Sequence, residues 1–188
     1  MYKLFFFVSF VLLCVLCDPV FDLAACMKIG VISDTHDRVE TVQAALAELR
    51  SHNIELLLHC GDIESPPTLE LFRDFPTHFV LGNCDWLPDQ LAAGISEIGG
   101  TLHNRFGHLE LGGIQIAWTH SHDRRLFHDL EHCGEYDFLF YGHTHVAEQH
   151  LTGKTLVVNP GALHRAREKT CVVLDSATGE LTTLRIRG

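Results

Sequence analysis

Short apolar runs alternate with polar loops along the first half of the chain. The runs at 27–33, 54–59 and 78–81 are almost continuously apolar, and each ends at a polar loop, as strands buried on both faces do. Between them, apolar residues recur at helical spacing in Val39–Ser51, and two prolines precede a shorter helical pattern in Thr68–Phe75. This order of strand, loop and helix predicts an α/β fold.

Strand patterns dominate the second half. Apolar segments flank turn-forming residues in three pairs: 109–111 with 114–118, 149–151 with 155–158, and 171–175 with 181–186. These pairs predict hairpins, and we also expect a helix at 126–133 and a buried strand at 138–141. We therefore expect this half to be mainly antiparallel. No linker or repeat interrupts residues 27–188, which predicts one domain over that range.

Residues 1–26 differ in character from the rest. Leu4–Cys17 is unbroken apolar sequence, too short for a stable membrane span but similar in shape to the hydrophobic region of a signal peptide. Leu23–Cys26 also resembles a lipoprotein cleavage box. Acidic residues separate these two features, however, and a buried-type strand begins directly at Met27. We therefore expect residues 1–26 to be upstream sequence and the protein to be cytoplasmic. An export signal or lipid anchor is the alternative.

Composition excludes some classes of function. Asp and Glu outnumber Lys and Arg by 24 to 14, a formal charge of −10, so the chain lacks the basic footprint of a nucleic-acid-binding protein. Beyond residue 26 the cysteines are scattered, which argues against a disulfide framework or a thiolate zinc site: Cys60, Cys84, Cys133 and Cys171. Histidine is abundant, with 14 copies, and it is the commonest metal ligand, so its positions matter most.

Asp, Asn and His side chains directly follow the predicted strands: Asp34, His36, Asp62, Asn83, His120, His122, His143 and His145. Open α/β sheets bind ligands at the C-terminal ends of their strands, and residues two apart in extended chain point the same way. Oxygen and nitrogen donors of this kind suit Mn, Fe, Ni or Zn. The set exceeds what one tetrahedral ion needs and suffices for two ions that share a bridging carboxylate.

These residues stand in five ordered motifs: Asp34-x-His36, Gly61-Asp62, Gly82-Asn83-x-Asp85, His120-x-His122 and Gly142-His143-x-His145. The series resembles the calcineurin-like metallophosphoesterases, most of all the small YfcE-type phosphodiesterases of bacteria and archaea. The resemblance implies a four-layer αββα sandwich of two mixed β-sheets flanked by helices, with a dinuclear centre. One metal would be held by Asp34, His36, Asp62 and His145. The other would be held by Asp62, Asn83, His120 and His143, with Asp62 bridging. Mn is the expected metal.

The chain departs from the family pattern at two positions. Cys84 stands where most of the superfamily has a histidine, a change that YfcE-type members often share. Ser121 replaces the glycine of the usual His-Gly-His motif, and serine tolerates left-handed backbone poorly, which puts the orientation of His122 in doubt.

Weaker signals lie outside the metal set. Arg38 and Arg165 could clamp a phosphate or simply be exposed, and Asn159-Pro160-Gly161 could be a turn or a substrate contact. The remaining histidines have no motif context, and we interpret them as surface or structural residues: His52, His78, His103, His108, His128, His132, His150 and His164.

The chemistry expected of such a site is hydrolysis of a small phosphate ester. A metal-bridging hydroxide would attack a phosphodiester in line, while Asn83 and His122 stabilise the equatorial oxygens. Alternatively His122 would protonate the leaving group, and Cys84 is a third candidate catalytic residue. Two other functions stay open at this point: a phosphomonoesterase, and a non-catalytic scaffold that resembles the small retromer subunit. Homo-oligomerisation is also open.

Overall fold

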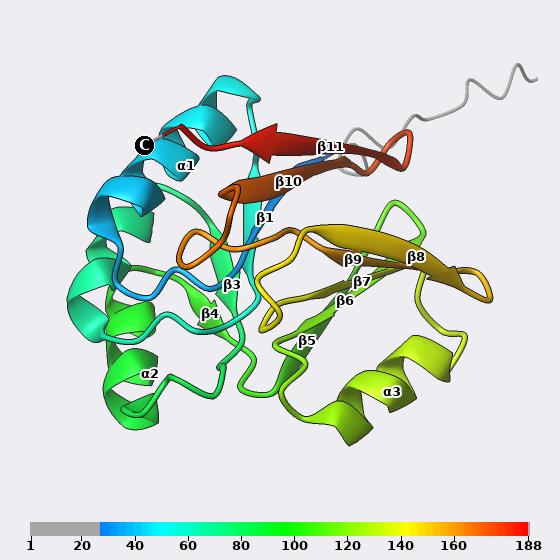
Figure 1. Cartoon of the computed structure of the whole chain (residues 1–188), viewed down its shortest axis with the longest axis horizontal. Helices are drawn as coiled ribbons and strands as arrows, with labels where there is room; N and C mark the ends of the chain where they lie inside the picture. The colour runs from blue at the N-terminus through cyan, green and yellow to red at the C-terminus, as the bar shows by residue number, and fades with distance from the viewer. Residues whose placement is uncertain (1–26, 188) are drawn as a thin grey trace, which may run out of the picture.

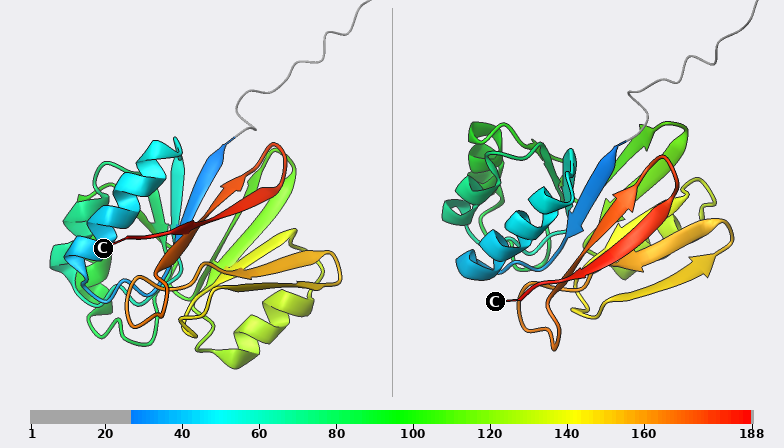
Figure 2. Two further views of the ribbon diagram at one scale, coloured as in Figure 1. Left: turned by 45° about the horizontal axis from the view of Figure 1, so that its top comes forward. Right: turned by 90° about the horizontal axis from the view of Figure 1, so that it is seen from above.

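Two β-sheets lie face to face, and helices cover the outer face of each (Figures 1 and 2). The computed structural model describes residues 27–187, so the expectations for residues 1–26 lie outside the described part of the chain. The arrangement confirms the predicted αββα sandwich. Within residues 27–187, no helix combines the length and the apolar character needed to cross a membrane.

The first sheet has six strands. Their order is β11 (Glu180–Arg185), β10 (Thr170–Asp175), β1 (Lys28–Ile32), β2 (Leu56–His59), β3 (Thr77–Phe79) and β4 (Thr101–Leu102). Strands β1 to β4 run parallel, with Ile32 beside His59 and His59 beside Phe79. Strand β10 runs antiparallel to β1, and β11 is antiparallel to β10. The sheet is therefore mixed.

The second sheet corrects one expectation. Its order is β5 (Phe106–Leu111), β6 (Ile114–Thr119), β7 (Phe138–Tyr141), β9 (Thr155–Asn159) and β8 (Glu148–Thr152). The predicted hairpins β5–β6 and β8–β9 form, but β6, β7 and β9 pair in parallel, so the mainly antiparallel expectation was wrong. Helix α3 (Arg124–His132) makes the crossover that parallel pairing requires between β6 and β7.

The helices match the apolar spacing only in part. Helix α1 (Val39–Ser51) has the expected bounds, and the expected helix at 68–75 is a 3₁₀ helix, η2 (Pro66–Phe72). Helix α2 (Pro88–Glu97) and the short strand β4 were not anticipated. Only Leu91 and Ile95 of α2 are buried, so its apolar pattern is sparse.

Three apolar layers hold the sandwich together. One lies between α1, α2 and the first sheet and includes Val42 and Leu57. The second lies between the sheets, where Trp118 and Phe140 are fully buried, and the third lies between α3 and the second sheet, around Leu139. Strands β1 and β7 are therefore covered on both faces, which explains their continuous apolar sequence.

Candidate metal centre

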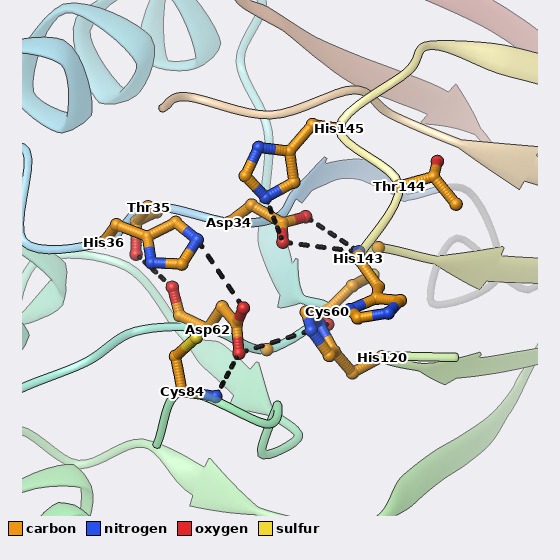
Figure 3. Close-up of polar contacts among 12 residues, drawn as sticks. Asp34, Thr35, His36, Cys60, Asp62, Cys84, His120, His143, Thr144 and His145 are labelled. Atoms are coloured by element: carbon orange, nitrogen blue, oxygen red, sulfur yellow. Dashed lines mark hydrogen bonds and ion pairs between the residues drawn. The ribbon is translucent and has the colours of Figure 1, made fainter. Parts of the chain in front are cut away.

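The loops that follow the parallel strands of both sheets meet at one edge of the sandwich (Figure 3). Within the first sheet, the Asp34 amide donates to the Gly61 carbonyl and the His36 amide to the Asp62 carbonyl, at 3.0 and 3.1 Å. Between the sheets, the His143 amide donates to Asp34 Oδ2 at 3.1 Å. The strand ends singled out in the sequence therefore converge.

Most of the candidate ligands occupy the left-handed region of backbone conformation. The φ angles are 54° at Asp34, 43° at His36, 58° at Asp62, 77° at His143 and 59° at His145. Such a conformation costs about 1–3 kcal/mol for a residue other than glycine, and it persists only where the surroundings enforce it. Strain of this kind gathers at functional sites, and here it directs carboxylates and imidazoles to one point.

Asp85 ties the β2 and β3 loops together. Asp85 is 8% exposed, and its carboxylate accepts four backbone N–H groups, those of Asp62, Ile63, Glu64 and Gly82, at 2.6–3.1 Å. Asp62 is itself a candidate ligand, and Gly82 directly precedes another candidate ligand, Asn83. Asp85 was only part of a motif in the sequence, and the structure makes it the residue that positions Asp62 and Asn83 together.

His59 is hydrogen-bonded to the loops that follow β1 and β2. The Gly61 amide donates to His59 Nδ1 at 3.1 Å, so the ring proton is on Nε2 and donates to Thr35 Oγ1, also at 3.1 Å. The Thr35 hydroxyl in turn donates to the Asp62 carbonyl. Complete burial lowers the pKa of His59 to about 3, so the ring is neutral near pH 7.

One group of potential ligands consists of Asp34, His36 and His145, whose ligand atoms lie within 4.8 Å of one another. His145 Nε2 is 3.1 Å from Asp34 Oδ1. Burial favours a raised pKa for Asp34, but the His145 hydrogen bond and the charge of His120 outweigh it and lower that pKa. His36 Nε2 is buried and has no hydrogen-bond partner within residues 27–187.

A second group consists of Asp62, His120 and Asn83. His120 Nδ1 lies 2.8 Å from the Cys60 carbonyl, which can only accept, so the ring proton sits on Nδ1. His120 Nε2 faces Asp62 Oδ1, 3.2 Å away, and Asn83 Oδ1, 3.1 Å away. Burial favours a lowered pKa for His120, but the contact with Asp62 outweighs it and raises that pKa. Electron-rich atoms that face one another in this way need a proton or a cation between them. The carbonyl partner on Nδ1 is the usual arrangement for a metal-binding histidine.

Asp62 stands between the two groups. Its Oδ2 is 3.5 Å from His36 Nε2, and its Oδ1 is the atom that faces His120. Burial favours a raised pKa for Asp62, but the His120 contact and the Cys84 amide, which donates at 2.8 Å, lower it. The residues present thus fit divalent cations, with one carboxylate oxygen directed to each side.

His143 and His122 complete the second side. Measured between ring centroids, His120 lies 5.2 Å from His143 and 5.4 Å from His122. Ser121 adopts the left-handed conformation of the glycine it replaces, with φ of 70°, and its hydroxyl donates to the Gly142 carbonyl at 3.0 Å. The backbone conformation that serine disfavours is therefore present, and it carries His122 to the rim beside His143.

Glycine is required at Gly82 and Gly142. A Cβ at Gly82 would overlap the Asp62 carboxylate, and a Cβ at Gly142 would overlap the Ser33 hydroxyl and approach Asp34. Both glycines precede candidate ligands. The missing side chain of Gly82 lets the backbone carrying Asn83 approach Asp62 in the same sheet, and that of Gly142 lets the backbone carrying His143 approach Asp34 in the opposite sheet.

Cys84 borders the first group. The Cys84 Sγ atom lies within 4.8 Å of a potential ligand atom of His36 and of one of Asp62. Partial burial and the neighbouring carboxylates, Asp62 foremost, raise the pKa of the Cys84 thiol to about 11. Cys84 is therefore a protonated thiol near pH 7, as suits a weak donor rather than a nucleophile.

Two residues outside the proposed ligand set, Asn159 and His164, contact the metal centre or its loops. Asn159 is buried and binds the Gly142 carbonyl, the Thr144 hydroxyl and the Gly161 amide, so it organises the His143–His145 loop from behind. His164, interpreted from the sequence as surface or structural, packs its ring 5.3 Å from that of His36 and binds Arg38. No motif marks His164, because its position depends on the path of the loop between β9 and β10.

The chain resembles known proteins in both sequence and structure. The family model described as a calcineurin-like phosphoesterase superfamily domain matches residues 27–179. A phosphodiesterase from Methanocaldococcus jannaschii is 30% identical over 138 residues, which cover 72% of this chain and 83% of that protein. The solved structure of an archaeal phosphodiesterase has a TM-score of 0.79 at 27% identity and covers 85% of this chain and 100% of its own.

More distant structures share the fold alone. The YfcE phosphoesterase from E. coli has a TM-score of 0.59 at 19% identity, covering 86% of this chain and 100% of its own. Vps29 from Entamoeba histolytica, complexed with zinc, has a TM-score of 0.57 at 19% identity, covering 85% of this chain and 98% of its own. The family match spans nearly all of the described residues, and the chain therefore belongs to the calcineurin-like phosphoesterase superfamily.

Proposed function

We propose that this protein is a phosphodiesterase that acts with two divalent metal ions, Mn²⁺ being expected and Fe, Ni or Zn the alternatives. One observation carries the proposal: His120 Nε2, Asp62 Oδ1 and Asn83 Oδ1, three potential ligand atoms, gather at the edge where both sheets meet, with His120 Nε2 3.1–3.2 Å from each oxygen. The family membership and the likeness to a named phosphodiesterase support it.

The proposed ligands divide as the two groups suggest. One ion would be held by Asp34, His36, Asp62 and His145, and the other by Asp62, Asn83, His120 and His143. The bridging role of Asp62 is supported by its two oxygens, which face His36 and His120 separately. When bound, the ions neutralise the phosphodiester charge and lower the pKa of water from 15.7 towards 7.

The remaining polar groups act on the substrate. Asn83 directs Oδ1 at His120 and Nδ2 at Cys84 Sγ, so its N–H atoms lie on the opposite side of the amide from its ligand oxygen. We assign Asn83 Nδ2 and a ring nitrogen of His122 to the equatorial phosphoryl oxygens, where donors stabilise the charge of the transition state. Water is the nucleophile, so no side chain needs to form a covalent intermediate.

Metal removal tests this function. Protein treated with a chelator and then dialysed should lose hydrolysis of bis(4-nitrophenyl) phosphate and regain it with Mn²⁺. Asp62→Ala and Asp62→Asn should both be severely impaired, because a neutral amide is a poor bridge between two cations. Asp129→Ala, at an exposed acidic residue of α3, is the matched control and should retain activity. Full activity after rigorous metal removal would contradict the proposal.

A monoester probe separates the two phosphoesterase activities. Faster turnover of 4-nitrophenyl phosphate than of the diester would show that the diester preference is wrong while leaving the metal requirement intact. The scaffold alternative has only the shared fold with Vps29 in its favour.

A further inference from the structure

Two arginines, Arg38 and Arg167, lie beside residues of the metal centre, although the chain as a whole carries a formal charge of −10. They come from the start of α1 and from residues 165–169 of the loop between β9 and β10, a stretch that also includes Arg165 and Lys169. The one acidic residue in that stretch of the loop, Glu168, pairs with Arg185 at 3.4 Å. In Figure 3, His36 and His143 lie on opposite sides of Asp34 and Asp62.

Arg38 is held in a defined orientation. Its Nε donates to His164 Nδ1 at 3.1 Å, and its Nη2 lies 3.5 Å from His164 Nε2. The His164 ring packs edge-on against the His36 ring, with centroids 5.3 Å apart. The His164 ring therefore separates Arg38 from His36, a proposed metal ligand. Most of the five N–H donors of Arg38 remain available. Among residues 27–187, no carboxylate forms an ion pair with Arg38 or Arg167.

A cavity opens next to the same ligands. It has a volume of about 430 Å³ and is lined by His145, Val146, Ala147, Arg167, Glu168 and Thr170. His145 connects it to the metal centre, since the His145 and His36 rings are 5.4 Å apart. The lining combines an apolar wall, in Val146 and Ala147, with the Arg167 guanidinium group, and the charge of its one carboxylate, Glu168, is balanced by the ion pair with Arg185. Such a lining suits an organic group that carries a negative charge.

We propose that Arg38, positioned by His164, and Arg167 in the cavity beside His145 bind a second phosphate group of the substrate. The preferred substrates are then phosphodiesters that carry an additional phosphate, as nucleotides do. This inference rests on the proposed phosphodiesterase function and names its substrate class. Guanidinium groups bind phosphate through paired, charge-assisted hydrogen bonds, which are worth more than neutral ones.

A pair of chromogenic diesters tests the proposal. Thymidine 3′-(4-nitrophenyl phosphate) and the same ester with a 5′-phosphate present the same reacting group and differ in one remote phosphate. The metal-loaded wild-type protein should have a kcat/KM about tenfold higher for the 5′-phosphorylated ester, the effect expected of one charge-assisted contact, and mainly through KM. Arg38→Ala should abolish most of this ratio, and Arg167→Ala should lower it.

Conservative variants separate binding from folding. Arg38→Lys keeps the charge but loses the Nε contact to His164, so an intermediate ratio is expected. His164→Gln, which retains a hydrogen-bond acceptor, should preserve more of the ratio than His164→Leu. Arg50→Ala, at the far end of α1, is the matched control and should keep the wild-type ratio. Equal kcat/KM for the two esters in the wild-type protein, or an unchanged ratio in Arg38→Ala, would overturn the proposal.

Equilibrium binding tests the second-phosphate site separately from the proposed phosphodiesterase activity. Thymidine 3′,5′-bisphosphate should bind the metal-loaded protein more tightly than thymidine 3′-phosphate by calorimetry, and Arg38→Ala should remove that difference. If neither ester is hydrolysed, the phosphodiesterase function fails, while the calorimetric difference still decides the role of Arg38. Equal affinities of the wild-type protein for both nucleotides would contradict the assignment.

Discussion

Removal of the Asp85 carboxylate should destabilise the metal-free protein by about 3–5 kcal/mol. Four backbone N–H groups, those of Asp62, Ile63, Glu64 and Gly82, would lose their acceptor in Asp85→Ala. Each buried unsatisfied donor costs about 1–3 kcal/mol, and water that enters the space relieves part of the total. The loss is large against a typical domain stability of about 5–15 kcal/mol.

Asp85→Asn should have a smaller effect of the same sign. Asp85 Oδ1 accepts from Ile63 and Glu64, and Oδ2 accepts from Asp62 and Gly82. An amide retains one oxygen, so one pair of donors keeps its acceptor while the other pair faces an NH₂ group. We expect Asp85→Asn to lie between the wild-type protein and Asp85→Ala.

Urea unfolding of the metal-free proteins measures these effects. Asp129→Ala, which removes an exposed carboxylate, is the control and should change the free energy of unfolding by less than about 0.5 kcal/mol. Because Asp85 joins the loops of Asp62 and Asn83, its loss should also weaken Mn²⁺ binding by about 10–100-fold, as removal of groups that orient ligands does. A destabilisation below about 1 kcal/mol in Asp85→Ala would refute the argument that these bonds hold the loops.

Further predictions concern His59, Cys84 and the N-terminus. The folded pKa of His59 is about 3, below the ordinary value of 6.5, so this ring contributes full stability above pH 6.5 and loses it as the pH falls towards 3. The metal-free wild-type protein should therefore lose about 2 kcal/mol more between pH 6.5 and 5 than His59→Gln does, and parallel losses in urea titrations would contradict this. Because Cys84 is a poor proton donor, aryl diesters should be cleaved faster than alkyl diesters. Cys84→Ala should lose little activity on the aryl ester, and Cys84→His should gain on the alkyl ester. Abolished aryl activity in Cys84→Ala with both metals bound would show a direct catalytic role. N-terminal sequencing of the native protein should give Met27 or Lys28, whereas a lipid-modified Cys26 would overturn that expectation.

The convergence of the site could be predicted because it follows from local pattern. Asp34 and Asp62 each follow a short apolar run, and parallel strands place such ends at one edge of a sheet. No long-range information was needed to group them. The resemblance to a known family then supplied the arrangement of two sheets, which the pattern alone left open.

Other features depend on contacts between distant segments. The hairpin turns near Gly112 and Gly153 were visible in the sequence, but they carry no information on how β6, β7 and β9 pair with one another. Helix α2 buries too few residues to stand out. His164 reaches His36 across more than a hundred residues of sequence, so no spacing rule could connect it with the metal centre.

A crystal structure of the protein with Mn²⁺, with anomalous scattering recorded at the metal edge, tests the central claim most directly. Two anomalous peaks about 3.5–4 Å apart are expected, with the Asp62 carboxylate contacting both ions. A single peak would contradict the dinuclear centre, as would two peaks that Asp62 does not bridge.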